Sequence, residues 1–296
     1  MGKQDRPLVS VPVVTYNSEK TIVETLDSIY NQTYPNLELI VSDDCSSDNT
    51  VEIVREWIDE HKDRFVRTEL ITIPENKGVS ANYNRAADAC YGEWVKDFDG
   101  DDIMLPECIQ TYVEYVTSHP KTIYVFSKVE VFGGDEKRRR NMTNFGKYDF
   151  FNWSKQRQYD YLTLEDNCIY SMGSFYNREE LIRRNIRYDE RIPLIEDWSR
   201  WIILIQNGIK LDFINQVLTK YRMSDNSLST QHKPSIAFQK SLALIYKYYR
   251  FANCYKRGDK KQAMYKYLRG ETLLHDNGLF WKSISKMYKI FVLHRW

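Results

Sequence analysis

The sequence has few cysteines and no cysteine pairs. Its 296 residues include five cysteines, an odd number, and none of them stands in a CxxC spacing. A disulfide framework needs paired cysteines, and a structural zinc site usually takes closely spaced pairs. The pattern argues against both kinds of site and indicates a reducing compartment.

Long apolar runs are also absent. The first residues, MGKQDRPLVS, contain no apolar signal core. No stretch approaches the roughly 20 apolar residues that a membrane-spanning helix needs. We therefore expect a cytoplasmic protein, whose contact with a membrane, if it makes one, is peripheral and on the inner face.

Charge is balanced over the whole chain but not along it. The net charge is +1, yet residues 231–296 hold 14 Lys and Arg against 3 Asp and Glu. The remaining residues hold 28 basic against 38 acidic side chains. A basic segment on an acidic body is typical of a protein with an anionic partner, such as a membrane or a nucleic acid.

Strand and helix patterns alternate through the first 130 residues. Runs rich in β-branched residues predict strands at Leu8–Val14, Leu37–Val41, Val66–Ile73, Glu93–Phe98 and Ile123–Phe132. Between them, apolar residues at helical spacing predict helices around 22–29 and 53–58, with Ser18 and Asp48 as N-caps. This alternation predicts an α/β fold with a mostly parallel sheet covered on both faces.

The pattern loosens after residue 133. We predict helices at 178–184 and from residue 198, a strand at 210–221, and two or three helices after Pro234. The aromatic segment Tyr148–Tyr161 suits stacking on a sugar. It suits a core or flap role equally well.

Polar side chains follow the ends of four predicted strands. They are Tyr16 and Asn17, Asp43 and Asp44, Asn76, and the run Asp99-Gly100-Asp101-Asp102. In open parallel sheets, ligands bind in the crevice beyond the carboxyl ends of the strands. Asp99 and Asp101 project the same way from an extended segment, and such paired oxygen ligands suit Mn²⁺ or Mg²⁺. Taken alone, the acidic run also fits a solvated turn.

The order and spacing of these motifs resemble one enzyme family. The segments VSVPVVTYN at 9–17 and LDSIYNQTYPNLELIVSDDCSSDNT at 26–50 closely resemble the opening of family-2 glycosyltransferases with the GT-A fold. The run NKGVS at 76–80, Asn84 and the acidic run at 99–102 follow in that family's order. The resemblance implies a GT-A fold and a metal-dependent, inverting sugar transfer from a nucleoside diphosphate, with a UDP-sugar as the expected donor.

The resemblance also implies three parts of the chain. We expect residues 1–132 to form the nucleotide-sugar-binding half of the GT-A domain and residues 133–230 the acceptor-binding and catalytic half. Residues 231–296 would form a basic helical extension. The expected acceptor is a glycan or lipid-linked hydroxyl in the synthesis of a surface polysaccharide or glycolipid.

Residues at the donor site take their roles from the resemblance. Thr15, Tyr16 and Asn17 would line the nucleotide pocket, with Glu19 at the uridine. Asp44, with its neighbour Asp43, would read the base. The motif around Asn76, Gly78 and Asn84 belongs to the same donor site. The residues themselves leave two alternatives open, in which Asn17 caps the first helix and Asp43 holds a turn.

The acidic run and a later arginine are the expected ligands of the metal and the diphosphate. The resemblance implies that Asp99 and Asp101 hold ribose, metal and diphosphate, with Asp101 the direct metal ligand. Tyr221-Arg222 resembles a loop that closes over the donor, so Arg222 would pair with diphosphate oxygens. Many relatives carry a histidine metal ligand where this chain has Ser224, and the candidates for a substitute are Asp225 and His232.

A second motif, Glu196-Asp197-Trp198, resembles the Glu-Asp motif of the family. The resemblance implies that Asp197 is the general base, and that Gly173 faces the acceptor. A carboxylate opposite the leaving group can take the proton of the attacking hydroxyl, which predicts inversion. The helix dipole would lower the pKa of Asp197 and a nearby diphosphate would raise it. The alternative is that Glu196 or Asp197 only caps the helix that follows.

Two residues depart from the pattern. Pro12 lies inside a predicted central strand, where its missing N–H requires a bulge or an edge position. Tyr83 stands where relatives commonly carry an arginine before the asparagine of this helix. If that arginine contacts the donor, this chain must hold the donor differently.

The basic tail has two interpretations. Apolar residues at 281, 284, 287, 288 and 291 define one helical face with lysines beside it. Such a helix is typical of an anionic membrane surface. The alternative is a helical cap whose basic face packs on the acidic body. No nucleic-acid module is recognisable, so we expect no nucleic-acid partner.

Two rival functions fit parts of the sequence. A sugar nucleotidyltransferase shares the sheet architecture, but it usually carries a glycine-rich phosphate loop where this chain has TYNSEK. A catalytically inactive scaffold would bind a nucleotide sugar without turnover, and the intact acidic pairs argue against it. We therefore expect an active glycosyltransferase of the hexosyltransferase kind.

Overall fold

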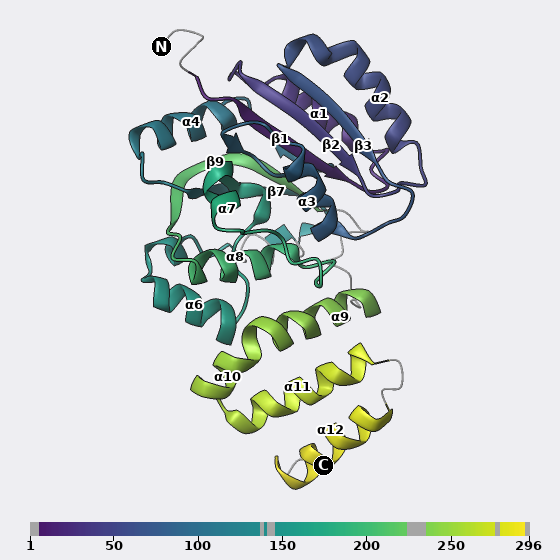
Figure 1. The fold of residues 1–296 in the computed structure, drawn as a ribbon, viewed down its shortest axis with the longest axis vertical. Coiled ribbons are helices and arrows are strands. Elements are labelled where there is room, and N and C mark those ends of the chain that lie inside the picture. The colour runs from purple at the N-terminus through teal and green to yellow at the C-terminus, as the bar shows by residue number, and fades with distance from the viewer. Residues whose placement is uncertain (1–5, 137–138, 141–145, 224–234, 276–278, 294–296) are drawn as a thin grey trace.

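The computed structural model describes residues 6–136, 139–140, 146–223, 235–275 and 279–293. A twisted sheet with helices on both sides forms the body of the molecule, and a stack of C-terminal helices extends from one end (Figure 1). The predicted α/β class and the predicted helical extension are both confirmed.

One mixed sheet of nine strands spans the body within the described residues. Its strands are β1 (Val9–Thr15), β2 (Leu37–Asp43), β3 (Arg67–Thr72), β4 (Trp94–Val95), β5 (Phe98–Asp99), β6 (Ile103–Met104), β7 (Tyr124–Gly133), β8 (Ser174–Asn177) and β9 (Leu211–Met223). Their order is β3-β2-β1-β4-β8-β7-β9-β6, with β5 also paired to β1. Five pairings are parallel, and β8 and β6 supply the antiparallel ones. The predicted mostly parallel sheet is confirmed.

The predicted strand at Glu93–Phe98 is interrupted. β4 pairs with Val9 and Ser10 of β1, and β5 pairs with Val13 and Val14. On this side of β1, the carbonyls of Ser10 and Val14 accept hydrogen bonds from the backbone of the neighbouring strand segments. Every second residue of a strand directs its backbone N and C=O to the same side, so the nitrogen of Pro12 points into the gap between β4 and β5. Its missing N–H therefore breaks no ladder bond. The predicted bulge or edge position is wrong, because the neighbouring strand is broken instead.

Buried charges fill this interruption. Lys96 is fully buried, and its Nζ donates to the carbonyls of Met172 at 2.5 Å and Asp97 at 3.3 Å. Asp97 accepts hydrogen bonds from the hydroxyls of Tyr176 at 3.0 Å and Tyr188 at 2.6 Å. These bonds satisfy charged groups that would otherwise be costly to bury.

Helices cover both faces of the sheet. The body contains α1 (Ile22–Tyr30), α2 (Thr50–His61), α3 (Val79–Asp88), α4 (Cys108–Ser118), α6 (Lys155–Leu164), α7 (Arg178–Arg183) and α8 (Glu196–Gln206), with short 3₁₀ turns η2 (Lys62–Arg64), η3 (Tyr148–Asn152) and η4 (Ser171–Gly173).

The N-cap of α1 is Thr21, so the predicted cap Ser18 is wrong, although the Ser18 carbonyl accepts the N–H of Ile22. Asp48 precedes the N-cap of α2, and its carboxylate accepts the first helical N–H, from Thr50, at 3.0 Å.

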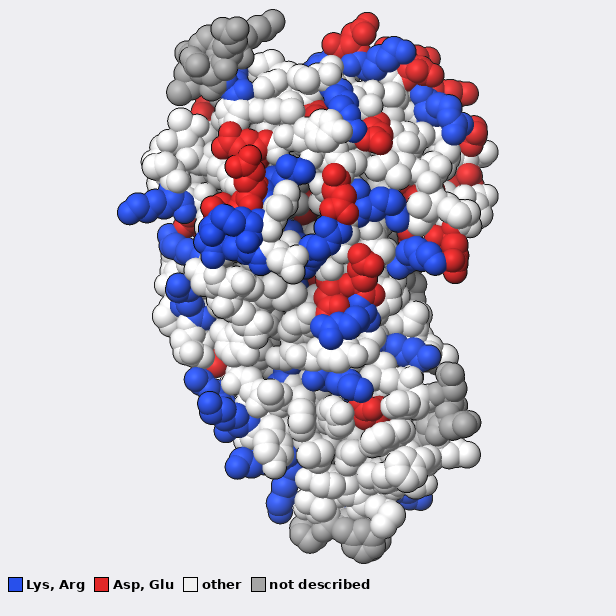
Figure 2. Space-filling model, in the orientation of Figure 1, with Lys and Arg blue, Asp and Glu red and all other residues white. Residues whose placement is uncertain are grey.

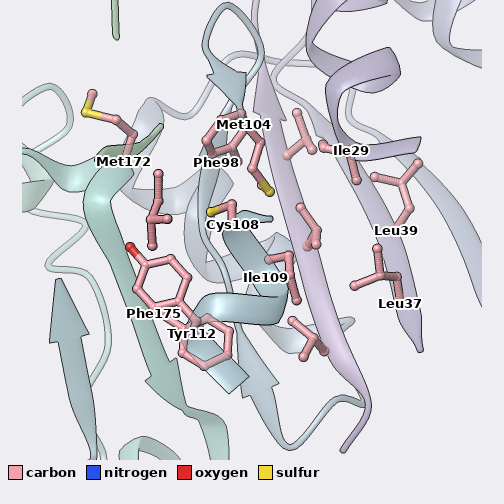
Figure 3. Close-up of a cluster of buried hydrophobic side chains, with 14 of the residues drawn as sticks. Ile29, Leu37, Leu39, Phe98, Met104, Cys108, Ile109, Tyr112, Met172 and Phe175 are labelled. Carbon is pink, nitrogen blue, oxygen red and sulfur yellow. The ribbon is translucent and has the colours of Figure 1, made fainter. Parts of the chain in front are cut away.

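Two apolar clusters lie on opposite faces of the sheet, because alternate strand residues point to opposite sides. One cluster joins Val9, Val11 and Val13 of β1 to α1, α2 and α4. Figure 3 shows part of it, with Tyr112 of α4 beside Phe175 of β8; their ring centroids are 4.8 Å apart. The other cluster packs α6 and α8 against Tyr124 and Phe126 of β7. The sheet thus lies between two cores.

The C-terminal extension consists of α9 (Ile236–Ile245), a π-helical turn η5 (Tyr246–Arg250), α10 (Phe251–Arg257), α11 (Lys260–Leu274) and α12 (Leu279–Phe291). Its first half packs on the body, where Arg257 forms an ion pair with Asp160 of α6. The helix α12 packs on α11 and lies at the end of the molecule farthest from the sheet (Figure 1). None of the described helices is long and apolar enough to cross a membrane.

Candidate active site

The carboxyl ends of β1, β2 and β5 meet at one edge of the sheet. Thr15 pairs with Asp43, and Val14 pairs with Asp99, so all three ends lie level. The hydroxyl of Thr15 donates to Asp43 Oδ2 at 2.9 Å. The polar residues that the sequence placed after these strands are therefore together, as predicted.

Asp43 and Asn17 fasten the loops after β1 and β2 to each other. Asp43 Oδ1 accepts the N–H of Ser46 at 2.8 Å and so holds its own turn. Asn17 adopts a left-handed conformation (φ 52°), and its Oδ1 accepts the N–H of Ser47 at 2.8 Å. The turn-holding role that the sequence left open for Asp43 is present, whereas Asn17 does not cap α1.

Asp44 holds a third loop in place. Its Oδ2 accepts the N–H groups of Gly78 at 2.7 Å and Lys77 at 3.1 Å, and its Oδ1 accepts from Arg85 at 3.2 Å. Asn76 returns a bond to the Asp44 carbonyl at 3.0 Å. Gly78 has φ +88°, and a Cβ there would lie 2.8 Å from Pro193, so only glycine fits. Asp44 is 2% exposed and positions the loop at 76–78.

Two nearby donor-site candidates face outward. Tyr16 is 52% exposed at the end of β1 and offers an open ring. Glu19 accepts the backbone N–H of Asn49 at 3.2 Å, which ties the start of α1 to the start of α2. Neither side chain is held in the core, so both remain accessible beside the strand ends.

The three carboxyl groups of the acidic run all have raised pKa values. Burial raises the pKa of Asp99, and the hydroxyl of Tyr83, which donates to Asp99 Oδ1 at 2.7 Å, opposes that rise. Burial and the Asp99 charge raise the pKa of Asp101 to about 7. Asp102 is fully buried, and its Oδ2 has no hydrogen-bond partner. Three carboxylates thus lie where negative charge is poorly compensated.

Arg222 of β9 reaches across this acidic run. Its Nε donates to the Asp101 carbonyl at 2.7 Å, and its backbone N–H donates to Asp102 Oδ1 at 2.8 Å. The guanidinium also forms an ion pair with Glu24 of α1. Arg222 is therefore beside the acidic run and already has one anionic partner.

Asp197 lies in the first turn of α8 with both carboxylate oxygens hydrogen-bonded. Oδ2 accepts from the Asn167 side chain at 2.8 Å, and Oδ1 accepts the N–H of Trp198 at 2.6 Å. The N-cap of α8 is Ile195, so neither Glu196 nor Asp197 is the cap residue. Burial raises the pKa of Asp197 to about 6 and that of Glu196 well above its usual value. Burial therefore outweighs the opposing effect of these hydrogen bonds on Asp197.

Three further candidates are enclosed in the protein. Asn84 donates to the Tyr188 carbonyl at 2.9 Å, and the Trp198 indole donates to the Leu162 carbonyl at 2.9 Å. A Cβ on Gly173 would lie 2.9 Å from the Ser127 carbonyl oxygen. Each is buried. These contacts join α3 to the segment at Tyr188, α8 to the end of α6, and η4 to β7.

Sequence reasoning missed two positioning residues. Asn167 lies in an irregular segment without periodicity, so no local signal connects it to Asp197. Tyr83 was noted as a departure, yet its bond to Asp99 depends on α3 packing beside β5. Its ring also stacks on Tyr188 at 4.9 Å. Both contacts join segments that are far apart in the sequence.

The acidic run fits a divalent cation that is shared with a substrate. Across the described residues, no three His, Cys, Asp or Glu side chains are arranged to hold a metal. Mg²⁺ usually takes one or two carboxylates and completes its shell with phosphate oxygens and water. Asp99 and Asp101 offer such a pair, and Oδ2 of the neighbouring Asp102 has no hydrogen-bond partner among the described residues. The predicted substitutes Asp225 and His232 lie outside the described residues, as does Ser224.

Comparison with known proteins identifies relatives over most of the chain. Residues 10–183 match the model of glycosyl transferase family 2. An uncharacterized glycosyltransferase of Methanocaldococcus jannaschii, MJ1057, is 30% identical over 80% of this chain and 78% of its own length. The Escherichia coli protein WfgD, a UDP-Glc:alpha-D-GlcNAc-diphosphoundecaprenol beta-1,3-glucosyltransferase, is 28% identical over 76% of this chain and 81% of its own.

Solved structures share the fold. Staphylococcus aureus TarS in complex with UDP-GlcNAc has a TM-score of 0.65 at 18% identity, covering 90% of this chain and 80% of that chain. A mannosyltransferase of Pyrobaculum calidifontis in complex with GDP-Man and Mn²⁺ has a TM-score of 0.58 at 21% identity, covering 96% and 74%. The predicted GT-A fold is confirmed by the similarity to these structures.

Removal of the Tyr83 hydroxyl tests the support of Asp99. We expect Tyr83→Phe to lower the free energy of unfolding by about 1–3 kcal/mol, because a buried carboxylate loses a hydrogen bond. Urea denaturation of metal-free protein measures the change. Tyr91→Phe, at an exposed ring, is the matched control and should change stability by less than about 0.5 kcal/mol. Equal stability of Tyr83→Phe and wild type would contradict the role of this bond.

Proposed function

The chain belongs to glycosyl transferase family 2, and from this membership we propose that it transfers a sugar from a UDP-linked donor to an acceptor hydroxyl with inversion. One observation carries the proposal. Burial raises the pKa of both Glu196 and Asp197, and the Asp99 charge raises both further, which supports a single site for the donor-side and acceptor-side carboxylates. A transferase needs these two sets of groups on either side of one reacting carbon.

On the donor side, we propose that Asp99 and Asp101 hold Mn²⁺ or Mg²⁺ with the diphosphate. A cation there offsets the charge that builds on the leaving nucleoside diphosphate. Arg222 would exchange its partner Glu24 for phosphate oxygens, which suit its planar fork. Asp44 would read the base together with the loop at 76–78 that its carboxylate holds, and Thr15, Tyr16, Asn17 and Glu19 would line the nucleotide.

On the acceptor side, we propose Asp197 as the general base. The acceptor hydroxyl loses its proton to Asp197 as its oxygen attacks the anomeric carbon, and the bond to the diphosphate oxygen breaks on the opposite face. Asn167 holds Asp197 Oδ2 and so orients the carboxylate. Glu196, whose pKa is raised by burial and by Asp197, would stay protonated and place no second charge beside the base.

We further propose that the acceptor is lipid-linked and that α12 contacts an anionic membrane. A relative whose acceptor is a diphosphoundecaprenol-linked sugar supports the lipid-linked acceptor. The helix α12 contains no Asp or Glu, and its Leu279, Phe280 and Met287 are 77%, 65% and 58% exposed, with Lys282 and Lys286 exposed beside them. On the face shown in Figure 2, the C-terminal end carries mainly basic side chains among uncharged ones.

The outward face of α12 differs from the predicted one. Trp281, Ile284 and Tyr288 are half-buried, Ser285 is buried, and the Trp281 ring stacks on His275 at 5.6 Å. Most of the predicted apolar face therefore packs inward. A membrane contact would use Met287, the exposed member of that face, together with Leu279 and Phe280.

A donor screen tests the proposed reaction. We expect one of the UDP-, GDP- and dTDP-sugars to stabilise the protein only with Mn²⁺ or Mg²⁺, since a ligand at 100 times its Kd contributes about 2.7 kcal/mol. Slow release of nucleoside diphosphate should accompany this binding. Thermal shift and a nucleotide-release assay measure both effects. Asp101→Ala should abolish them, because the cation loses its ligand.

Asp59→Asn, an exposed carboxylate on α2, is the matched control and should behave as wild type. Binding without turnover in the presence of acceptors would favour the scaffold. Pyrophosphate release from a nucleoside triphosphate and a sugar phosphate would favour the nucleotidyltransferase. No binding of any nucleotide sugar would contradict the donor site.

The pH dependence of turnover tests the general base. The base works only when deprotonated, and burial raises the pKa of Asp197 to about 6. We therefore expect kcat/KM to fall about tenfold per pH unit below that value. Asp197→Asn should lower kcat by about 10²–10⁴-fold. Asn167→Ala should move the acid limb to higher pH, because Asn167 favours the carboxylate.

The control variant is Glu179→Gln, which removes an acid from the first turn of another helix, α7. It should keep the wild-type kcat and the wild-type pH profile of kcat/KM. Wild-type rates in Asp197→Asn would exclude it as the base. An unchanged acid limb in Asn167→Ala would show that this amide only supports the fold.

Vesicle binding tests the membrane contact. We expect sedimentation with vesicles of phosphatidylcholine and phosphatidylglycerol, and none with phosphatidylcholine alone. Each lysine near an anionic surface contributes about 1 kcal/mol. The pair Lys282→Glu and Lys286→Glu should therefore weaken binding by at least about tenfold. Lys62→Glu, at the opposite end of the molecule, is the control. Equal binding of all variants, or binding that salt does not weaken, would rule out this surface.

A further inference from the structure

A cavity of about 550 Å³ lies between η3 and α6, outside the donor site. Its wall contains Trp153 and Tyr161, whose ring centroids are 5.4 Å apart at an angle of 65°. Behind them Phe150 is fully buried and contacts both rings, at 5.5 and 6.3 Å. The aromatic segment thus divides into a core part and a part that faces this cavity.

Polar groups surround these rings. Lys147 donates to the Tyr161 hydroxyl at 2.7 Å, and the Arg157 guanidinium lies 4.0 Å from the centre of the Trp153 ring. The exposed carboxylates of Asp149 and Glu165 also line the cavity, and neither has a hydrogen-bond partner among the described residues. The cavity therefore presents apolar ring surface beside open acceptors and two cations, each of which lies over one face of a ring.

This combination suits a sugar ring. Small-molecule sites usually measure about 300–1,000 Å³ and combine aromatic walls with a few polar groups. Aromatic rings accept the apolar C–H face of a sugar, and carboxylates accept its hydroxyl protons. A lipid tail would not use the charged rim, and an inorganic anion would not use the rings.

The cavity lies on the acceptor side of the proposed reaction centre. Glu165 lines it, and Asn167, two residues further on, holds Asp197. Two residues of chain span at most about 7 Å. The helix α6 also packs directly on α8, where the Trp198 indole donates to the Leu162 carbonyl.

We propose that this cavity binds a sugar unit of the acceptor behind the unit that is glycosylated. The inference rests on the proposed function and deepens it, because it makes the acceptor an oligosaccharide of at least two units. Trp153 and Tyr161 stack on the ring, while Asp149 and Glu165 accept its hydroxyl protons. The chain would then read the length of its acceptor and not only the terminal sugar.

Saturation-transfer NMR tests this site without any donor. The probes are cellobiose and N,N′-diacetylchitobiose, with glucose and N-acetylglucosamine as single-unit comparisons. We expect transfer to at least one disaccharide and at least tenfold weaker binding in Trp153→Ala. Asp149→Asn with Glu165→Gln leaves the aromatic packing intact and should also weaken binding. Tyr91→Ala, an exposed ring that carries Arg67 at 4.3 Å, is the matched control.

Each other outcome overturns the proposal. Disaccharide binding that survives both sets of substitutions would place the saccharide elsewhere. Absence of binding by all four saccharides to wild type would exclude a glycan subsite, and binding of inorganic phosphate instead would make the cavity an anion site. The donor screen fails or succeeds independently, because it uses no saccharide acceptor and this test uses no nucleotide.

Discussion

The crowding of carboxylates at one edge of the sheet is the constraint on which the site depends. Asp99, Asp101 and Asp102 follow the central strands, and Glu196 with Asp197 approaches from α8. Burial and mutual repulsion raise their pKa values. Tyr83, Arg222 and Asn167 each supply one hydrogen bond against this repulsion. Stability alone would favour neutral residues here, and this crowding is the basis of the cation and proton-transfer roles proposed above.

The sequence predicted what local patterns determine. The strands end where β-branched runs stop, so the clustering of Asp43, Asp44 and Asp99 followed from their positions alone. The break between β4 and β5 was missed, because Lys96 is stabilised by a carbonyl of η4, and Asp97 by Tyr176 of β8 and by the distant Tyr188. Asn167 was missed for the same reason. The partner of the apolar face of α12 stayed open in the sequence, since periodicity shows that a helix is amphipathic but not which neighbour it meets.

The C-terminal extension supports the acceptor side of the body. Arg250 donates to the carbonyls of Thr163 and Glu165, and its guanidinium lies 4.6 Å from the centre of the Trp198 ring. It therefore contacts both the end of α6 and the start of α8. A displacement of α9–α10 would disturb the segment that carries Asn167. The first helices of the extension thus brace the segments that carry Asn167 and Asp197.

The ion pair between Arg222 and Glu24 has a consequence for the surface of the protein. Glu24 lies on the exposed side of α1, and its carboxylate is neutralised as long as Arg222 faces it. If phosphate oxygens take the guanidinium, this carboxylate is released to solvent. Binding of the donor would then add one uncompensated negative charge to the exposed surface of α1, outside the crevice.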